Sequence, residues 1–292
     1  MNWPEEVPIV CGLDRAYLPP FLTMITSLSR SHGAAVASLW LVILHDELTP
    51  HDRQAVLDTA ARAGLSAELR QVATRHEEWP VSGWVSPAVY LRLTAAESLP
   101  EFTRALYLDV DTLVLRDLRP LLATDLGGAP LGAVRDPQNP VLKSGIALPG
   151  WAELGLPGER EYFNSGVMLL DLDVCRRTGL FERASSFLTC HPSSARFWDQ
   201  DALNWAADDS WCRLERQWNT FALTPLIDRG RFVHYAEHII PLSELVDDER
   251  GAAVLHFAGP DKPWRDGYPP GPFLDLYRAH AAGTTVAGES HA

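Results

Sequence analysis

The sequence lacks an apolar run long enough to cross a bilayer. Its longest apolar run, residues 39–44, is far shorter than the roughly 20 residues that a membrane-spanning helix needs. The opening letters MNWPEE lack the basic start of a secretory signal peptide. We therefore expect a cytoplasmic protein without a transmembrane segment, for which peripheral contact with a membrane stays open.

Cysteine is scarce and widely spaced. The four cysteines form no CxxC pair, and no histidine accompanies them at zinc-finger spacing; they are Cys11, Cys175, Cys190 and Cys212. This pattern argues against a structural zinc site and against a disulfide scaffold. It predicts buried, reduced thiols.

Positive charge is also scarce. The chain has 25 Lys and Arg against 38 Asp and Glu, a formal net charge of −13. Such an acidic protein is repelled by a nucleic-acid backbone, so we expect no nucleic-acid partner. Lys143 and Lys262 are the only lysines, and a lysine kept in this composition can mark a place that needs a compact positive charge.

Apolar content for a core is plentiful, because 46% of the 292 residues are hydrophobic. This excludes intrinsic disorder for the bulk of the chain. In the first half, extended and helical patterns alternate, which predicts βαβ units of the nucleotide-binding type. The extended patterns cover residues 8–11, 38–45, 66–72 and 105–108, and the helical ones cover residues 17–30, 49–63 and 89–98.

The second half is less regular and contains a Pro/Gly-rich excursion over residues 137–158. Strands are predicted at residues 131–134, 162–172 and 254–257, and helices at residues 174–188 and 200–207. We find no internal repeat and no linker that forces a boundary. The chain is therefore predicted to form one domain over residues 1–282, followed by a flexible tail over residues 283–292.

The strongest local signal for chemistry is the pair Asp109 and Asp111 after the buried strand at residues 105–108. In an extended segment, residues i and i+2 point to the same side, so both carboxylates can face one cation. The alternative is a turn at the strand end in which one Asp caps the backbone.

His256 also follows a short apolar run and precedes a glycine turn. In open α/β sheets, ligands bind at the edge where strands lead into such loops. A structural histidine is the simpler interpretation. Two carboxylates and an imidazole nevertheless suit Mn²⁺, with Mg²⁺ as the second choice.

Three further segments contain polar residues that fit structural or ligand-binding roles. Asn164 and Ser165 precede a glycine and fit either a tight turn or a hydrogen-bonding surface for a hydroxyl-rich ligand. Asp199 and its neighbour Gln200 open a helix, where Asp199 can be a simple N-cap. Lys262, with Gly259 upstream, can hold a phosphate.

Taken in order, these pieces resemble the retaining glycosyltransferases of family 8, the group that includes bacterial lipooligosaccharide galactosyltransferases and glycogenin. The resemblance covers roughly residues 8 to 275. It is carried by six segments in the expected order: residues 9–14 with Tyr17, residues 90–92, 106–111, 162–167, 199–204 and 256–264.

The resemblance implies a GT-A fold, an α/β single domain with a mixed central sheet flanked by helices and a Rossmann-like N-terminal half. A nucleotide-binding half at about residues 8–115 would join an acceptor-binding half at about residues 116–282. The implied activity moves a hexose, galactose or glucose, from a UDP-sugar to a saccharide or glycoconjugate acceptor with the help of Mn²⁺.

The resemblance also implies roles for individual residues. Asp109, Asp111 and His256 would be the metal ligands, and Asp109 would also contact the donor. The other donor-binding residues would be Asp14, Tyr17, Arg92, Asn164, Ser165, Gly259 and Lys262. Asp136 matches a position near the acceptor sugar.

Gln200 and Asp199 would be the catalytic residues beside the reacting carbon. Gln200 matches the position closest to the anomeric carbon, and an amide is a poor nucleophile. This favours attack by the acceptor on the face from which the diphosphate leaves, while Asp199 keeps a covalent double displacement open.

The sequence departs from the family pattern at Ser165, where many members have Ala, and at Arg15 and Ala16 beside the nucleotide, so the donor preference stays open. Two rival functions are a catalytically silent sugar-binding protein of the same fold and a phosphohydrolase of the haloacid dehalogenase type. The latter has a similar Asp-x-Asp strand but requires a Thr where this chain has Leu113.

Overall fold

The computed structural model describes residues 7–73, 79–81 and 85–282. The predicted tail at residues 283–292 lies outside the described residues. Within them, the central sheet has seven strands. Their order is β3 (Ser66–Gln71), β2 (Trp40–His45), β1 (Ile9–Leu13), β4 (Arg104–Leu108), β7 (Phe163–Asp171), β6 (Leu131–Arg135) and β8 (Cys212–Arg213).

The sheet is mixed, as predicted. Strands β3, β2, β1 and β4 are parallel neighbours, whereas β7 runs antiparallel to both β4 and β6, and β8 is parallel to β6. A second, three-stranded sheet has the order β5 (Thr112–Val114), β10 (Val254–His256) and β9 (Thr220–Phe221). The sequence patterns did not predict β5, β8 or β9.

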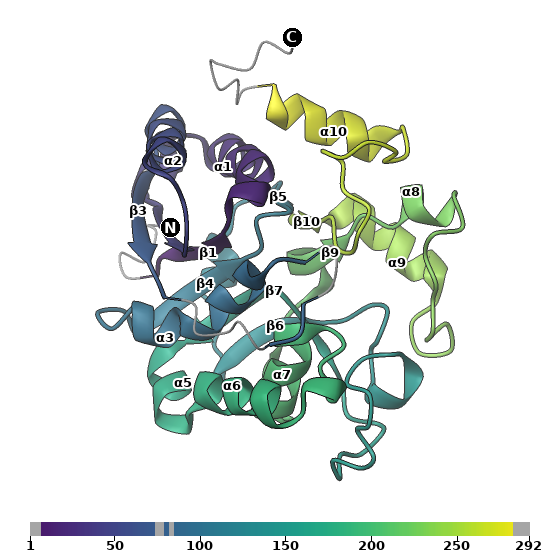
Figure 1. Ribbon diagram of the computed structural model, residues 1–292. Helices are drawn as coiled ribbons and strands as arrows, with labels where there is room; N and C mark the ends of the chain where they lie inside the picture. Colours follow the sequence, from purple (N-terminus) through teal and green to yellow (C-terminus); the bar gives the residue numbers. More distant parts are fainter. Residues whose placement is uncertain (1–6, 74–78, 82–84, 283–292) are drawn as a thin grey trace.

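Helices cover both faces of the central sheet (Figure 1). The α-helices are α1 (Leu18–His32), α2 (Pro50–Arg62), α3 (Ala95–Ser98), α4 (Arg119–Leu122), α5 (Leu172–Thr178), α6 (Leu180–Cys190), α7 (Trp198–Ala207), α8 (Thr224–Ile227), α9 (Leu242–Asp248) and α10 (Pro272–Ala281). The 3-10 helices are η1 (Arg15–Tyr17), η2 (Gly33–Ser38), η3 (Pro87–Thr94), η4 (Leu142–Ser144), η5 (Pro192–Ser194), η6 (Arg216–Asn219) and η7 (Glu249–Gly251).

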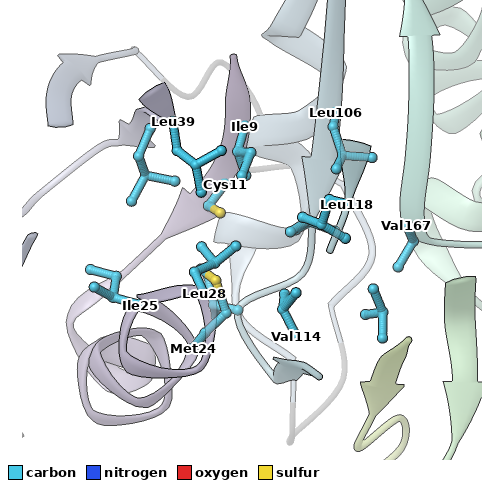
Figure 2. Packing of buried hydrophobic residues seen from close by; sticks show 14 of the residues in the cluster. Ile9, Cys11, Met24, Ile25, Leu28, Leu39, Leu106, Val114, Leu118 and Val167 are labelled. Atoms are coloured by element: carbon cyan, nitrogen blue, oxygen red, sulfur yellow. The ribbon is translucent and has the colours of Figure 1, made fainter. Parts of the chain in front are cut away.

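Alternation along the strands divides the core between the two faces. In β1, Ile9 and Cys11 pack with helix α1 in one cluster, whereas Val10 packs with η3 and α6 in another. Figure 2 shows Ile9, Cys11 and Leu106 facing Met24 and Leu28 of α1. The period-2 pattern of a strand therefore supplies both layers of helices with an apolar surface.

Several predicted elements differ in detail. The helix predicted at residues 89–98 is the 3-10 helix η3 followed by the short α3. The helix predicted at residues 174–188 is two helices, because Gly179 takes a left-handed conformation (φ 62°) between α5 and α6. Helices α4, α8, α9 and α10 were not predicted. Of the cysteines, Cys11 and Cys175 are buried, but Cys190 is exposed and Cys212 is partly exposed.

Candidate active site

All residues that were predicted to bind the metal, the donor or the acceptor, or to act in catalysis, line one cleft beyond the carboxyl ends of β1 and β4. The cleft has about 1010 Å³ of empty volume, including space open to solvent. The predicted residues on its walls are Asp14, Tyr17, Arg92, Asp109, Asp111, Asp136, Asn164, Ser165, Asp199, Gln200, His256, Gly259 and Lys262.

Asp109 and Asp111 lie in the turn that joins β4 to β5. Thr112 closes this turn by donating from Oγ1 to the carbonyl oxygen of Asp109 at 2.8 Å. The prediction that an extended segment aligns the two carboxylates was therefore wrong in its geometry. The turn nevertheless leaves one oxygen of each carboxylate within 4.8 Å of the other.

His256 reaches the same place because β10 pairs antiparallel with β5, which places His256 opposite Thr112. Its Nε2 lies 3.3 Å from Oδ1 of Asp111 and 4.0 Å from Oδ2 of Asp109. One ligand atom from each of the three side chains lies within 4.8 Å of the others. Two carboxylate oxygens and an imidazole nitrogen at this separation form a donor set that a divalent cation can occupy.

Two residues without a predicted role surround the His256 ring. Asn219, at the end of η6, places its Oδ1 2.9 Å from Nδ1 of His256. Gly166 makes room for the ring, because a Cβ atom at this position would lie 2.4 Å from Cε1 of His256. Nothing in the sequence marked Asn219, whereas Gly166 was noted only as part of a turn.

The segment containing Asn164 and Ser165 lies within the strand predicted at residues 162–172, and it does not form a tight turn, which was one of its two interpretations. It belongs to β7, where the pairing with β6 shifts register between Ala133 and Val134. A β-bulge of this kind interrupts the regular hydrogen bonding between two strands and changes the direction of the side chains there. Here it turns Asn164 and Ser165 toward the cleft, while the carbonyl oxygen of Gly166 accepts a hydrogen bond from the Asp109 backbone at 2.7 Å.

Lys262 is buried and compensates the charge of Asp111. Its Nζ lies 2.5 Å from Oδ2 of Asp111 and 2.6 Å from the carbonyl oxygen of Phe257. Burial alone would raise the pKa of Asp111, but Lys262 and then His256 outweigh it and lower this pKa. Asp111 is therefore held as a carboxylate.

Arg92 is buried and contacts three polar groups of the cleft. Its Nη2 donates to Oδ1 of Asp109 at 2.7 Å, and its Nε lies 3.1 Å from Oδ2 of Asp199. Its Nη1 donates to both the carbonyl and the hydroxyl oxygen of Ser165. Burial opposes its charge, but Asp109 and Asp199 outweigh this effect and raise the pKa of Arg92.

Asp199 is buried beside Arg92 and accepts a hydrogen bond from the Ser165 hydroxyl at 2.9 Å. Burial raises its pKa to about 6, and Arg92 limits the shift. Asp109 has a raised pKa for the same first reason, burial, again opposed by Arg92. Ser165 thus links the guanidinium to Asp199, a link that Ala at this position would not provide.

The Gln200 amide is fully hydrogen-bonded. Its Oε1 accepts from Nδ2 of Asn164 at 2.8 Å and from the backbone N–H of Ser165 at 3.1 Å. Its Nε2 donates to Oδ2 of Asp136 at 3.2 Å and to the Tyr162 hydroxyl at 3.1 Å. Burial raises the pKa of Asp136, although the backbone N–H of Asn139 opposes the shift.

Asp201, also in α7, was not predicted as a site residue. It is completely buried and accepts hydrogen bonds from the Tyr162 hydroxyl and from the backbone N–H groups of Leu148 and Phe197. Burial raises its pKa to about 7 despite these bonds. These bonds tie the start of α7 to neighbouring backbone, and the only signal in the sequence was the cluster of polar residues where the helix begins.

The remaining predicted residues lie at the rim of the cleft. Asp14 caps η1 by accepting a hydrogen bond from the Tyr17 backbone at 2.9 Å. The Tyr17 ring meets Trp264 edge-on at 5.8 Å. Gly259 has a left-handed backbone (φ 87°) in the turn after β10, which lets the chain return toward Lys262.

Fold and site together define a class: an α/β protein whose ligand cleft, lined by paired charges and amides, lies at the carboxyl edge of its parallel strands. The family model for glycosyl transferase family 8 matches residues 8–267. The chain belongs to this family and is a glycosyltransferase, which confirms the predicted family and favours it over a phosphohydrolase.

Relatives and solved structures agree with this assignment. The chain is 28% identical over 266 residues to the lipopolysaccharide 1,2-glucosyltransferase of Escherichia coli K12, covering 90% of this chain and 74% of that protein. It is 26% identical over 256 residues to general stress protein A of Bacillus subtilis, covering 84% and 81%. The crystal structure of the galactosyltransferase LgtC with donor and acceptor sugar analogs matches with a TM-score of 0.78 at 24% identity, covering 97% and 98%. This match confirms the GT-A fold.

Among the residues that the structure describes, no helix has the length and apolar character that crossing a membrane requires. The expected cytoplasmic location and peripheral membrane contact stay predictions.

Proposed function

We propose that this protein is a retaining hexosyltransferase that moves galactose or glucose from a UDP-sugar to a saccharide or glycoconjugate acceptor with the assistance of Mn²⁺. The observation that carries the proposal is the convergence of Asp109, Asp111 and His256 in the cleft, from segments almost 150 residues apart in the chain. Mg²⁺ is the second choice of metal, because imidazole favours Mn²⁺ in a set with two carboxylates.

The fit of a metal depends on which nitrogen of the His256 ring is available to bind it. Nδ1 is occupied by Asn219, so Nε2 is the nitrogen that faces both carboxylates. Asp109, Asp111 and His256 would hold the ion. When bound, it would neutralise charge on the departing diphosphate, an effect typically worth several kcal/mol.

The charges of the protein itself support the proposed use of a metal. Three carboxylates, Asp109, Asp111 and Asp199, are paired with two cations, Arg92 and Lys262, which leaves one negative charge when all are ionised. The whole chain is also acidic. A nucleoside diphosphate would be repelled by this field, so we expect its binding to depend on the metal.

We assign the donor's phosphates to the side of Lys262 and Gly259, and its uracil and ribose to the side of Asp14 and Tyr17. The transferred sugar would contact Asn164 and Ser165, whose amide and hydroxyl groups match sugar hydroxyls. Asp136 would contact the acceptor sugar. All of these residues line the same cleft, which supports the assignment.

For the chemical step we propose attack on the same face as the departing diphosphate. The bond from the acceptor oxygen to the anomeric carbon forms as the bond to the diphosphate breaks, and a phosphate oxygen takes the acceptor's proton. Gln200 is an amide with every polar atom hydrogen-bonded, which makes it a positioning group and not a nucleophile. Asp199 is held between Arg92 and Ser165, which restrains it from attacking the sugar.

The proposal is tested by incubating the protein with UDP-galactose, UDP-glucose and other nucleotide sugars, with Mn²⁺ or with a chelator, and measuring release of UDP. We expect slow metal-dependent hydrolysis of one UDP-hexose and faster release once a saccharide acceptor is added. Binding of a UDP-hexose, seen as a thermal shift, without any release would support the catalytically silent sugar-binding protein instead.

A further inference from the structure

A buried chain of hydrogen-bonded amide side chains connects the His256 ring to helix α7. We call this chain, which consists of Asn219, Asn164 and Gln200, the amide chain. Nδ1 of His256 lies 2.9 Å from Oδ1 of Asn219, and Nδ2 of Asn219 lies 2.8 Å from Oδ1 of Asn164. Nδ2 of Asn164 lies 2.8 Å from Oε1 of Gln200. All four side chains are buried, so each of these polar atoms depends on its neighbour for a hydrogen bond.

Two backbone N–H groups determine which group donates and which accepts in every hydrogen bond of the amide chain. The N–H of Gly166 donates to Asn164 at 2.9 Å, and the N–H of Ser165 donates to Gln200 at 3.1 Å. A backbone N–H can only donate, so the atoms that face these groups are the amide oxygens. The NH₂ group of Asn164 therefore points to Gln200, and its oxygen points to Asn219.

This direction continues to the histidine. Because the Asn164 oxygen accepts, Asn219 must turn its NH₂ group toward it and its own oxygen toward His256. An amide oxygen has no proton to donate, so Nδ1 of His256 must carry the hydrogen. In the neutral ring, Nε2 then bears the lone pair, and Nε2 is the atom that faces Asp109 and Asp111.

We propose that Asn219 is a positioning residue that holds His256 as the Nδ1–H tautomer and so makes Nε2 the metal-ligating atom. The metal part of this inference rests on the proposed function, but the tautomer does not. Partners of this kind fix the orientation of metal-binding histidines, and their loss typically lowers metal affinity about 10-fold to 100-fold.

The tautomer is measured directly on protein labelled with ¹⁵N-histidine, without metal, at an alkaline pH above which the ring signals no longer change. Long-range ¹H–¹⁵N spectra distinguish the two tautomers, and the signals missing from His256→Gln identify this ring. We expect the Nδ1–H form in the unmodified protein. The Nε2–H form would overturn the proposal without any need for a variant of Asn219.

Two substitutions separate the two ends of the Asn219 side chain. Asn219→Asp keeps an oxygen for Nδ1–H but cannot donate to Asn164, so the tautomer should persist. Asn219→Ala removes both contacts, so we expect mixed tautomers and Mn²⁺ affinity, measured by calorimetry, that is about 10-fold to 100-fold weaker. Thr220→Val is the control. Thr220 is buried next to Asn219 in the sequence, but its hydroxyl donates to the Arg216 carbonyl and it does not belong to the amide chain.

The outcomes separate the two claims. Unchanged tautomer and unchanged Mn²⁺ affinity in Asn219→Ala would show that Asn219 only fills space, and would overturn the inference. An Nδ1–H ring in a protein that binds no Mn²⁺, with or without UDP, would support the tautomer and contradict the metal role in the proposed function.

Discussion

The two sides of the cleft solve the problem of burying polar groups in different ways. The ionic side, defined as Arg92, Asp109, Asp111, His256 and Lys262, balances full charges against each other. The amide side, defined as Asp136, Asn164, Gln200 and Asn219, relies on amide hydrogen bonds around a single carboxylate.

The difference indicates what each side can recognise. A buried charge pair can exchange partners with an incoming ion, so the ionic side suits a metal and a diphosphate. Amides offer fixed donors and acceptors and suit uncharged hydroxyl groups, for which geometry decides specificity. The two sides meet where Asn219 contacts His256, so a substitution on one side can also affect binding on the other side.

The largest effect should come from removing a charge on the ionic side. Asp111→Asn takes a ligand from the metal set and leaves Lys262 without its carboxylate partner. We expect loss of measurable Mn²⁺ binding and a fall in transfer rate of about 10³-fold, the equivalent of several kcal/mol. Glu97→Gln removes the same charge from an exposed position and should leave both quantities unchanged.

Next in size is a change on the amide side alone. Gln200→Ala removes a group placed beside the reacting carbon, and loss of one preorganised contact of this kind typically costs about 100-fold or more in turnover. Binding of UDP with Mn²⁺, measured by calorimetry, should stay close to that of the unmodified protein. A full transfer rate in Gln200→Ala would remove its proposed role.

A third change tests the point where the two sides meet. In Gly166→Ala the new methyl group would lie 2.4 Å from the His256 ring, which must move. We expect Mn²⁺ affinity to fall about 10-fold to 100-fold, the usual range for disturbing the support of a ligand. The control is Gly251→Ala, where an added Cβ meets nothing within 4 Å; equal affinities in the two variants would contradict the steric argument.

The smallest effect concerns pH. Burial raises the pKa of Asp199 to about 6, so the carboxylate that pairs with Arg92 is ionised above this pH and protonated below it. At saturating Mn²⁺, kcat/KM should fall about tenfold per pH unit below 6 if the ionised form is required. Asp199→Asn should lower turnover, leave nucleotide binding intact and lose this acid limb. Persistence of the limb would assign it to another group.

The regular elements of the first half were predictable because their periodicity is long enough to detect. Strands β1, β2 and β3 and helices α1 and α2 appear where alternating and helical patterns placed them. In contrast, β8 and β9 have two residues each and β5 has three. Such short segments do not show the alternation of apolar and polar residues by which a strand is recognised in a sequence. Only their pairing in the folded structure, such as that of β9 with β10, defines them as strands.

The residues of the candidate site also divide into those that the sequence could predict and those that it could not. Residues with distinctive chemistry, such as Asp109, Asp111 and His256, were predicted, and the structure brings them together in one cleft. Asn219 was missed because one asparagine in an aperiodic segment carries no signal. Its position follows from the pairing that sets Thr220 beside Leu255, which no local pattern encodes.

The proposed activity depends most on one divalent ion that binds between Asp109, Asp111 and His256. Diffraction at the manganese absorption edge, from crystals grown with UDP and Mn²⁺, tests it directly. We predict a single anomalous peak at coordination distance from both carboxylates and from Nε2 of His256, next to the diphosphate. A peak elsewhere, or bound UDP with no peak between these side chains, would contradict the proposed metal site.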